Sequence, residues 1–489
     1  MTKARDIADS TATLNVDGGT IKLDGNYPTG SANVALGNVA LDDVGLTGAN
    51  NTAIGNNAAS ANTSGAENTI VGSSAFATNT TGGQNVAIGR SALNANTTAS
   101  NNTAVGYQAL TENTTGAANN AIGYNSQGAV TTGSGNVSVG VSALGLNTTG
   151  GQNVAIGNSA LYKTTSAGNT GVGNEAGYYL TSGTGNTSIG AYALKGTANT
   201  NTSNNTGVGY LALTRLTFGT GLTAVGRASG TFNTTGSQNT YLGINSGYSN
   251  TTASNNTGLG SEALFASTTG AQNTAVGRLA LRRNTTATGN TAVGYNSAAF
   301  TTTGAANTAL GMESLYSNTT ASNNTAMGHK ALKFNTTGAQ NTAVGTNALT
   351  ANTTASSNTV MGYNAGDNIT TSPSNTIMGQ NAGTNITTGN GENVLIGNRA
   401  GVNMSTGAQN VIMGDNGGAS LTTAVQNTFV GDNSGDAVTT GSHNSILGRY
   451  NGNQGGLDIR TSNNNIVLSD GAGNPRLHIN SAGAVSAPG

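Results

Sequence analysis

The stretch Asn85–Asn101, NVAIGRSALNANTTASN, is one copy of a repeat that runs through most of the chain. Its leading Asn defines 25 starts between Asn33 and Asn444, with a degenerate copy at Leu222, and 20 of the 24 intervals are 17 residues long. A period this constant predicts a stack of equivalent coils, because every copy must meet its neighbour in the same register. The repeat therefore predicts an elongated solenoid.

The start of each copy has the pattern of a short β-strand. Val86 and Ile88 alternate with Ala87, and alternation with period two is typical of a strand with one buried face. We expect the strand Val and Ile side chains to point into the core. Gly89 follows, and we expect a side chain there either to clash with the next coil or to forbid the backbone angles of the turn.

The rest of each copy holds a second apolar pair and a polar turn. Ala92 and Leu93 predict a second short strand, and Asn113–Gly116, NTTG, is typical of the turns that close the coil. Each coil then offers about four small inward apolar side chains. The leading Asn residues are expected to stack into a ladder of amides that satisfies polar groups in so thin a core.

Composition excludes an ordinary globular core. The chain of 489 residues has 75 Gly, 4% aromatic and 7% charged residues, with no Trp and no Cys. Only 4 Pro and little charge also argue against disorder. The net charge of −1 provides no electrostatic basis for binding nucleic acid or inserting into a membrane, and no apolar run is long enough to span one.

We therefore predict an all-β fold, a parallel β-roll or β-solenoid of about 25 coils. At about 4.8 Å per coil such a stack would be roughly 120 Å long. Four small apolar side chains per coil are few for a lone chain, which favours an intertwined or side-by-side homotrimer. The alternative is a self-sufficient monomeric solenoid. Handedness of the coil does not follow from the pattern.

The two ends depart from the repeat and predict three parts: an N-terminal attachment segment (1–32), the repeat region (33–448), and a C-terminal connector with a short strand cap (449–489). In the first part we expect a short helix from Lys3 to Asp9, then a hairpin of Leu14–Val16 with Ile21–Leu23. In the last part we expect strands at 466–468, 477–479 and 484–485. Irregular ends protect a repeat array from edge pairing.

The NVAIG and NTAVG motifs over residues 33–448 resemble the head of trimeric autotransporter adhesins, which is a left-handed parallel β-roll. The opening MTKARDIAD and the closing NNNIVLSDGAGNPRLHINSAGAV are similar to segments of bacteriophage tail fibres. The signal peptide and membrane barrel of the adhesins have no counterpart here. Together, the resemblances imply a virion fibre whose N-terminal segment attaches to other virion proteins.

No pattern in the sequence predicts an enzyme. The three histidines, His329, His443 and His478, lie far apart, and no nucleophile, phosphate-binding or zinc motif occurs, so we expect no catalytic residues, no cofactor and no metal. The acidic stretch 431–436 lacks the alternating ligands of a calcium loop.

A tyrosine often follows the Gly that ends the strand, and these side chains predict a surface stripe able to contact sugars. The stripe comprises Tyr107, Tyr124, Tyr210, Tyr295 and Tyr363. The alternative is that these rings only pack over the turn and solubilise the edge.

The functional hypothesis is a non-enzymatic structural fibre of a virion, assembled in the host cytoplasm and attaching to a host receptor or glycan. A trimeric adhesin on a bacterial cell surface is the first alternative. An ice- or surface-binding solenoid is the weaker one, because the Thr pairs of the turns vary too often to form a flat crystal-matching face.

Overall fold

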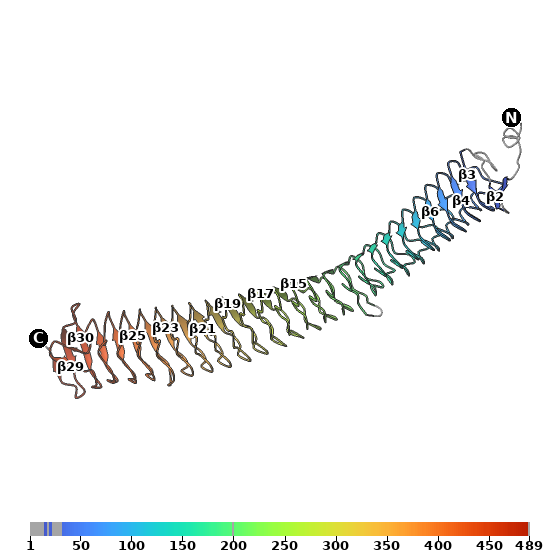
Figure 1. Cartoon of the computed structure of the whole chain (residues 1–489). Coiled ribbons are helices and arrows are strands. Elements are labelled where there is room, and N and C mark those ends of the chain that lie inside the picture. Colours follow the sequence, from blue (N-terminus) through green and yellow to red (C-terminus); the bar gives the residue numbers. More distant parts are fainter. Residues whose placement is uncertain (1–13, 17–18, 22–31, 198–199, 488–489) are drawn as a thin grey trace. The chain divides into compact units, whose positions relative to one another are not determined.

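The computed structural model describes residues 14–16, 19–21, 32–197 and 200–487. Contacts divide the chain into unit 1, Met1–Gln238, and unit 2, Asn239–Gly489. Every regular element in the described residues is a β-strand. In each unit, one three-residue strand per coil stacks on the strand of the next coil (Figure 1). The predicted all-β parallel solenoid, with about 25 coils spaced by roughly 17 residues, is confirmed.

Unit 1 opens with the expected hairpin, β1 (Leu14–Val16) paired antiparallel with β2 (Gly19–Ile21), so that the second strand begins two residues earlier than predicted. The helix expected at residues 3–9 lies outside the described residues. The coils of unit 1 carry β3 (Val34–Leu36), β4 (Thr52–Ile54), β5 (Thr69–Val71), β6 (Val86–Ile88), β7 (Thr103–Val105), β8 (Asn120–Ile122), β9 (Val137–Val139), β10 (Val154–Ile156), β11 (Thr170–Val172), β12 (Thr187–Ile189), β13 (Thr206–Val208) and β14 (Thr223–Val225).

Unit 2 repeats this arrangement, with each strand paired parallel and in register with the equivalent residues of the next coil; Thr257, for example, lies opposite Thr274. Its coils carry β15 (Thr240–Leu242), β16 (Thr257–Leu259), β17 (Thr274–Val276), β18 (Thr291–Val293), β19 (Thr308–Leu310), β20 (Thr325–Met327), β21 (Thr342–Val344), β22 (Thr359–Met361), β23 (Thr376–Met378), β24 (Val394–Ile396), β25 (Val411–Met413), β26 (Thr428–Val430) and β27 (Ser445–Leu447).

The end of unit 2 closes the stack with antiparallel strands. A small hairpin of β28 (Asn453–Gln454) and β29 (Leu457–Asp458) follows the last repeat. β30 (Ile466–Ser469) then pairs parallel with β27, so that the parallel ladder extends one strand past the repeat. β31 (Pro475–Ile479) and β32 (Val485–Ser486) add to it antiparallel. β30, β31 and β32 lie close to where the sequence predicts strands, whereas β28 and β29 were not predicted.

The orientation of the strand side chains is the reverse of the expected one. The middle residue of β6, Ala87, is fully buried, whereas Ile88 is 38% exposed. Likewise Ile122 is 45% and Val139 38% exposed. The strand Val and Ile side chains therefore point outward, and the core contains the small middle residue. The middle position is the one that faces the opposite wall of the coil, and it is Ala in many coils and Ile in others, such as Ile70 and Ile377.

Core volume is shared between the strand and the turn that faces it. Where the middle strand residue is Ala, a Leu such as Leu93 fills the core. In the coil of β15 the roles are exchanged. Tyr241 occupies the strand position, and the Leu is replaced by Gly247, where a Cβ would lie 2.3 Å from the Tyr ring. In such coils a large residue on one wall packs against a small residue on the other. The coil of β5, in which Ile70 and Phe76 are both buried, and the coil of β18, with Ala292 and Ala298, depart from this rule.

The predicted second strand at Ala92–Leu93 is wrong, because this segment is a turn. Ser91 and Leu93 have φ of 58° and 50°, which places them in the left-handed region and prevents an extended strand. The turn still hydrogen-bonds to the next coil, with the Leu93 N–H donating to the Ala109 carbonyl at 3.0 Å. The backbone polar groups of this segment are therefore hydrogen-bonded without a second strand.

The expected amide ladder is present. The Asn85 backbone N–H donates to the Asn68 Oδ1 at 2.9 Å, and the Asn85 Nδ2 donates to the same oxygen at 3.1 Å and to the Ala99 carbonyl at 3.0 Å. A second ladder, which the sequence analysis missed, runs through the buried Asn of the NTT turn. Asn96 Nδ2 donates to Asn79 Oδ1 at 2.9 Å. The first ladder satisfies the polar groups at its corner of the core, whereas some acceptors of the second ladder, such as Asn113 Oδ1 and Asn352 Oδ1, have no hydrogen-bond partner.

At the Gly that ends each strand, a side chain would both clash with the next coil and be strained by the backbone angles, the two effects that the sequence suggested. Gly89 has a φ of +132°, and a Cβ built there would lie 2.3 Å from the Gly106 carbonyl oxygen of the next coil. The backbones of adjacent coils approach this closely because neither residue has a side chain.

Candidate functional site

The fourth residue of each coil forms an apolar row along the outer face of the sheet. These residues are branched aliphatics or Met in every coil, and many keep a large exposed fraction, such as Ile122 (45%), Leu242 (46%) and Leu310 (43%). The members are Leu36, Ile54, Val71, Ile88, Val105, Ile122, Val139, Ile156, Val172, Ile189, Val208 and Val225 in unit 1, and Leu242, Leu259, Val276, Val293, Leu310, Met327, Val344, Met361, Met378, Ile396, Met413, Val430, Leu447 and Leu468 in unit 2.

No charged or polar residue interrupts the apolar row in either unit. In unit 2 a shallow hollow lies on this face between Val430, Leu447 and Leu468. Single exposed aliphatic residues are ordinary on a protein surface, but a contiguous series of them is typical of an interaction face. The row is therefore the most extensive candidate contact surface of the described chain.

The five tyrosines predicted as a surface stripe are all exposed, and their ring contacts differ from one to the next. Tyr107 and Tyr124 stack with their ring centroids 5.5 Å apart and planes 9° from parallel. Tyr210 meets the edge of Tyr192 at 6.1 Å. Tyr295 lies 5.7 Å from the Arg278 guanidinium. No ring contact joins Tyr363 to another aromatic residue among the described residues.

A second group of aromatic residues, which the sequence analysis missed, lies on the turn that follows the strand. We call the set in unit 2 the aromatic–cation ladder; it comprises Tyr248, Phe265, Arg282, Arg283, Phe300, Tyr316, Lys333 and Phe334. Tyr248 and Phe265 stack at 5.2 Å with planes 3° from parallel. Phe300 meets Tyr316 at 4.8 Å in an edge contact. Six successive coils contribute to this set.

Cations of the ladder lie over the rings and pair with glutamates of the preceding coil. Arg283 lies 4.4 Å from the Phe300 centroid. Arg282 pairs with Glu262 at 2.8 Å, and Lys333 with Glu313 at 2.8 Å. The bond from Lys333 lowers the pKa of the Glu313 carboxyl below its usual value.

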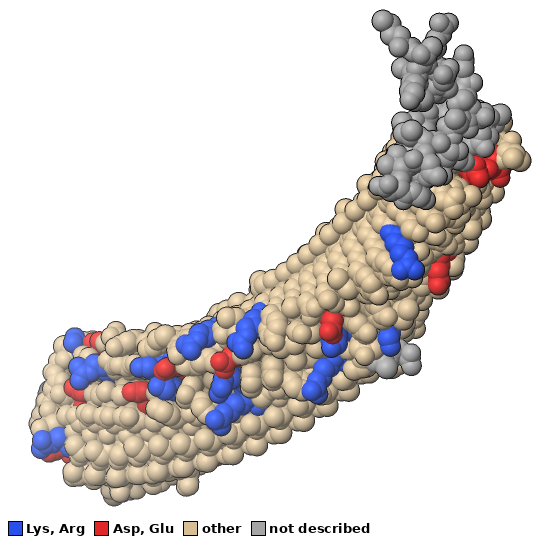
Figure 2. Space-filling view, turned by 45° about the vertical axis from the view of Figure 1, so that its right-hand side comes forward, with Lys and Arg blue, Asp and Glu red and all other residues tan. Residues whose placement is uncertain are grey.

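Unit 1 contains a smaller group of the same kind. Tyr162 and Tyr178 stack at 5.1 Å, and Lys163 lies 4.8 Å from the Tyr179 ring. Lys195 pairs with Glu175 at 2.6 Å, and this bond raises the pKa of the lysine. In all three Glu pairs the cation lies 20 residues after the Glu, a spacing visible in the sequence. Figure 2 shows Lys and Arg side chains, with a few Asp and Glu beside them, on a surface that is mostly uncharged.

Among the described residues no three His, Asp or Glu side chains gather as a metal site would require. Asp432 of the acidic stretch pairs with Arg449 at 3.2 Å. His478 contacts Asn465 Oδ1 at 3.0 Å, and partial burial lowers the pKa of its imidazole. Within the described residues no helix is long and apolar enough to cross a membrane.

Thr hydroxyls of the turns are used within the stack. The Thr97 Oγ1 donates to the Thr114 carbonyl of the next coil at 3.1 Å, and the Thr114 Oγ1 donates to the Thr131 carbonyl at 3.0 Å. The first Thr of each pair is therefore a structural residue. The second Thr, such as Thr98 or Thr115, is exposed.

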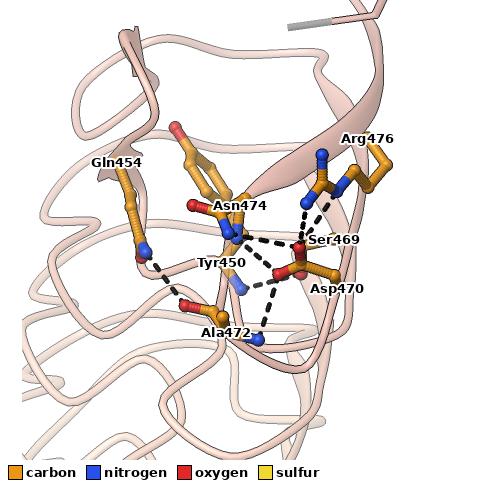
Figure 3. Close-up of polar contacts among 7 residues, drawn as sticks. All are labelled: Tyr450, Gln454, Ser469, Asp470, Ala472, Asn474 and Arg476. Atoms are coloured by element: carbon orange, nitrogen blue, oxygen red, sulfur yellow. Dashed lines mark hydrogen bonds and ion pairs between the residues drawn. The ribbon is translucent and has the colours of Figure 1, made fainter. Parts of the chain in front are cut away.

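The C-terminal cap is organised around one carboxylate, Asp470 (Figure 3). Its Oδ1 accepts the backbone N–H groups of Ala472 and Asn474 at 3.0 and 2.9 Å, and its Oδ2 accepts the Arg476 Nε at 2.9 Å. These bonds hold the pKa of Asp470 well below its usual range. The carboxylate thus fixes the turn between β30 and β31, and both of its oxygens are hydrogen-bonded within the cap.

No family model, no curated protein and no solved structure matches this chain.

Proposed function

We propose that the chain is a non-enzymatic structural fibre of a virion, used in attachment to a host surface, and that its repeat region is a parallel homotrimer. The observation that carries the proposal is the uninterrupted apolar row. Three copies in the same register would each bury this row against the other two. Because every strand of the described coils pairs within its own chain, the copies would lie side by side rather than intertwined.

The energy of such contact favours association. Burying the remaining exposed part of one Val, Ile, Leu or Met side chain contributes about 0.5–1 kcal/mol. The contribution recurs in each of the coils, whereas the loss of translational and rotational freedom, about 4–15 kcal/mol, is incurred once per association step. A long stack therefore gains more from association than a short one.

The ends of the chain support a virion rather than a bacterial cell surface. Both the opening and the closing residues are similar to phage tail-fibre segments, and the closing segment forms the antiparallel cap of β30, β31 and β32. In this proposal the N-terminal segment attaches to other virion proteins, and the repeat region reaches the host receptor or glycan. The bacterial surface adhesin remains the alternative.

Immunogold labelling of purified virions tests this proposal. Antibodies raised against residues 239–489 should label fibres that project from the particles, and tail or baseplate genes should neighbour the coding sequence. Label confined to the surface of uninfected bacteria, with a secretion locus beside the gene, would support the adhesin instead.

The non-enzymatic part has its own test. A glycosidase needs two carboxyl groups about 5–10 Å apart, and several of the described carboxylates, such as Glu262 and Glu313, are instead paired with cations. Purified protein should therefore leave the chain length of host capsular polysaccharide unchanged. Depolymerisation that a single Asp or Glu substitution abolishes would contradict this.

A further inference from the structure

Charge is unevenly distributed along unit 2. Residues 239–357 contain five Lys or Arg and two Glu, a net charge of +3, whereas residues 358–489 contain four Arg and seven Asp or Glu, a net charge of −3. The basic part coincides with the aromatic–cation ladder. For a chain whose net charge is only −1, this separation concentrates positive charge where most of the ring contacts of unit 2 lie.

Two of the five cations form ion pairs and three do not. Arg282 and Lys333 pair with Glu262 and Glu313. No ion pair within the described part of the chain engages Arg278, Arg283 or Lys330. Arg283 belongs to the ladder. Lys330 occupies the repeat position of Glu262 and Glu313, whose carboxylates pair with ladder cations, and Arg278 occupies the position before that one. Arg278, Arg283 and Lys330 are the cations available to an external anion.

Rings of the ladder lie against Arg282 and Arg283 and are themselves covered. Phe265 has Tyr248 on the side of the preceding coil and Arg282, at 5.7 Å, on the side of the following coil. Phe300 has Arg283 on one side and Tyr316 on the other. A cation held over a ring face is attracted by the ring quadrupole and loses part of its conformational freedom, so it is preorganised for a ligand.

This geometry selects the ligand. Bases of a single-stranded nucleic acid need open ring faces for stacking, and here neighbours occupy the faces. The ring edges, which carry the positive part of the quadrupole, and the unpaired guanidinium groups favour carboxylates. A stack of coils presents these groups in a line, which suits an extended polymer with regularly spaced anions.

We propose that the aromatic–cation ladder of unit 2, together with the adjoining Arg278 and Lys330, binds an extended acidic polysaccharide, with these two cations and Arg283 pairing with its carboxylates. The inference rests on the proposed attachment function and specifies the class of host glycan that the fibre holds. The ladder belongs to the turn after the strand, so it does not use the apolar row proposed for trimer contact.

Binding of the full-length protein to immobilised polygalacturonate tests the inference, with dextran as a neutral polysaccharide and single-stranded oligo(dT) as a nucleic acid. The protein should bind polygalacturonate with an affinity that falls as salt is raised, and should bind dextran and oligo(dT) far more weakly. Arg283→Gln should weaken binding about fivefold to tenfold, the loss of one charge-assisted contact. Phe300→Leu should weaken it about threefold, because Arg283 loses the ring that positions it.

Arg399→Gln is the matched control, because it removes one exposed positive charge from the acidic part of the same unit. It should leave the affinity unchanged, and Lys330→Gln repeats the test if Arg283→Gln fails to fold. Equal losses from Arg283→Gln and Arg399→Gln, or equal affinity for oligo(dT) or dextran, would overturn the inference. Binding that depends on Arg283 in a protein absent from virions would instead refute the proposed function alone.

Discussion

Removing one amide from the ladder that lines the core should destabilise a defined region of unit 2. Asn273 is fully buried. Its Nδ2 donates to the Ala287 carbonyl at 2.9 Å and to Asn256 Oδ1 at 3.2 Å, and its Oδ1 accepts the Asn290 backbone N–H at 2.9 Å. Asn273→Ala deletes all three bonds and leaves the Asn290 N–H without that acceptor.

The magnitude follows from the partners that remain buried. An unsatisfied buried donor or acceptor costs about 1–3 kcal/mol. The Ala287 carbonyl keeps a bond from Asn284 Nδ2 at 3.2 Å, so the main penalty falls on the Asn290 N–H. We expect Asn273→Ala to destabilise the coils around it by about 2–4 kcal/mol. Because each coil contacts its neighbours, the loss should decay within a few coils instead of unfolding the chain.

Hydrogen exchange followed by mass spectrometry measures this effect coil by coil. Amides of residues 256–306 should exchange faster in Asn273→Ala, while amides of residues 393–448 should be unchanged. The control is Gln272→Ala, which alters an adjacent, exposed side chain and should change protection by less than about 0.5 kcal/mol. Equal effects of the two substitutions, or faster exchange throughout unit 2 in Asn273→Ala, would refute the reasoning.

Three further substitutions have defined outcomes. Gly106→Ala should lower the free energy of unfolding, measured with urea, by about 3 kcal/mol or more, because φ is +142° and the Cβ would lie 2.4 Å from the Gly123 carbonyl oxygen. Gly289→Ala is the control: with φ of +69° and open space around the Cβ, it should lower this free energy by only about 1 kcal/mol. Ala118→Gly should stabilise the protein by about 0.5 kcal/mol, since Ala118 is exposed and has a φ of 57°, which Gly adopts without strain. Ala117→Gly should destabilise it, because the φ of Ala117 is not positive. Burial raises the pKa of Asp367, so its ionised form is disfavoured in the folded state and stability should rise as pH falls through that pKa. Asp367→Asn should therefore raise the melting temperature at pH 7 and lose this advantage near pH 3. The exposed control, Asp415→Asn, should change the melting temperature little. An advantage of Asp367→Asn that persists at pH 3 would show that charge is not its cause.

The coil, its strand and its amide ladder could be predicted from the sequence because each depends on one position of the repeat. The leading Asn and the strand-ending Gly recur at fixed spacing, and both have the roles inferred for them. The terminal strands were also predictable from short apolar runs between turn residues.

The direction of the strand side chains was not predicted, because the reasoning assumed that the largest apolar side chains lie inside. The sequence contains a signal against that assumption. Where the middle strand residue is large, as at Tyr241 or Phe429, the turn residue that faces it is Gly247 or Gly435 instead of Leu. Such compensation shows that the middle residue faces the core and leaves its Val and Ile neighbours outside.

The aromatic–cation ladder was missed because its contacts join different coils. Glu262 and Arg282 are 20 residues apart, a spacing that differs from the repeat by three residues and becomes a contact only once the coils are stacked. The five tyrosines of the candidate stripe share one repeat position, whereas the residues of the ladder occupy several positions of the turn. A pattern at one position therefore does not reveal the ladder.

The central claim is that the apolar row is buried between three copies of the chain, and the mass of the native protein in solution tests it most directly. Light scattering coupled to size exclusion should give three times the 47.9 kDa of one chain. Asp substitutions at three neighbouring members of the row, Ile122, Val139 and Ile156, should lower that mass toward one chain without loss of the β signal in circular dichroism. A folded, fully β wild-type protein with the mass of a single chain would contradict the account.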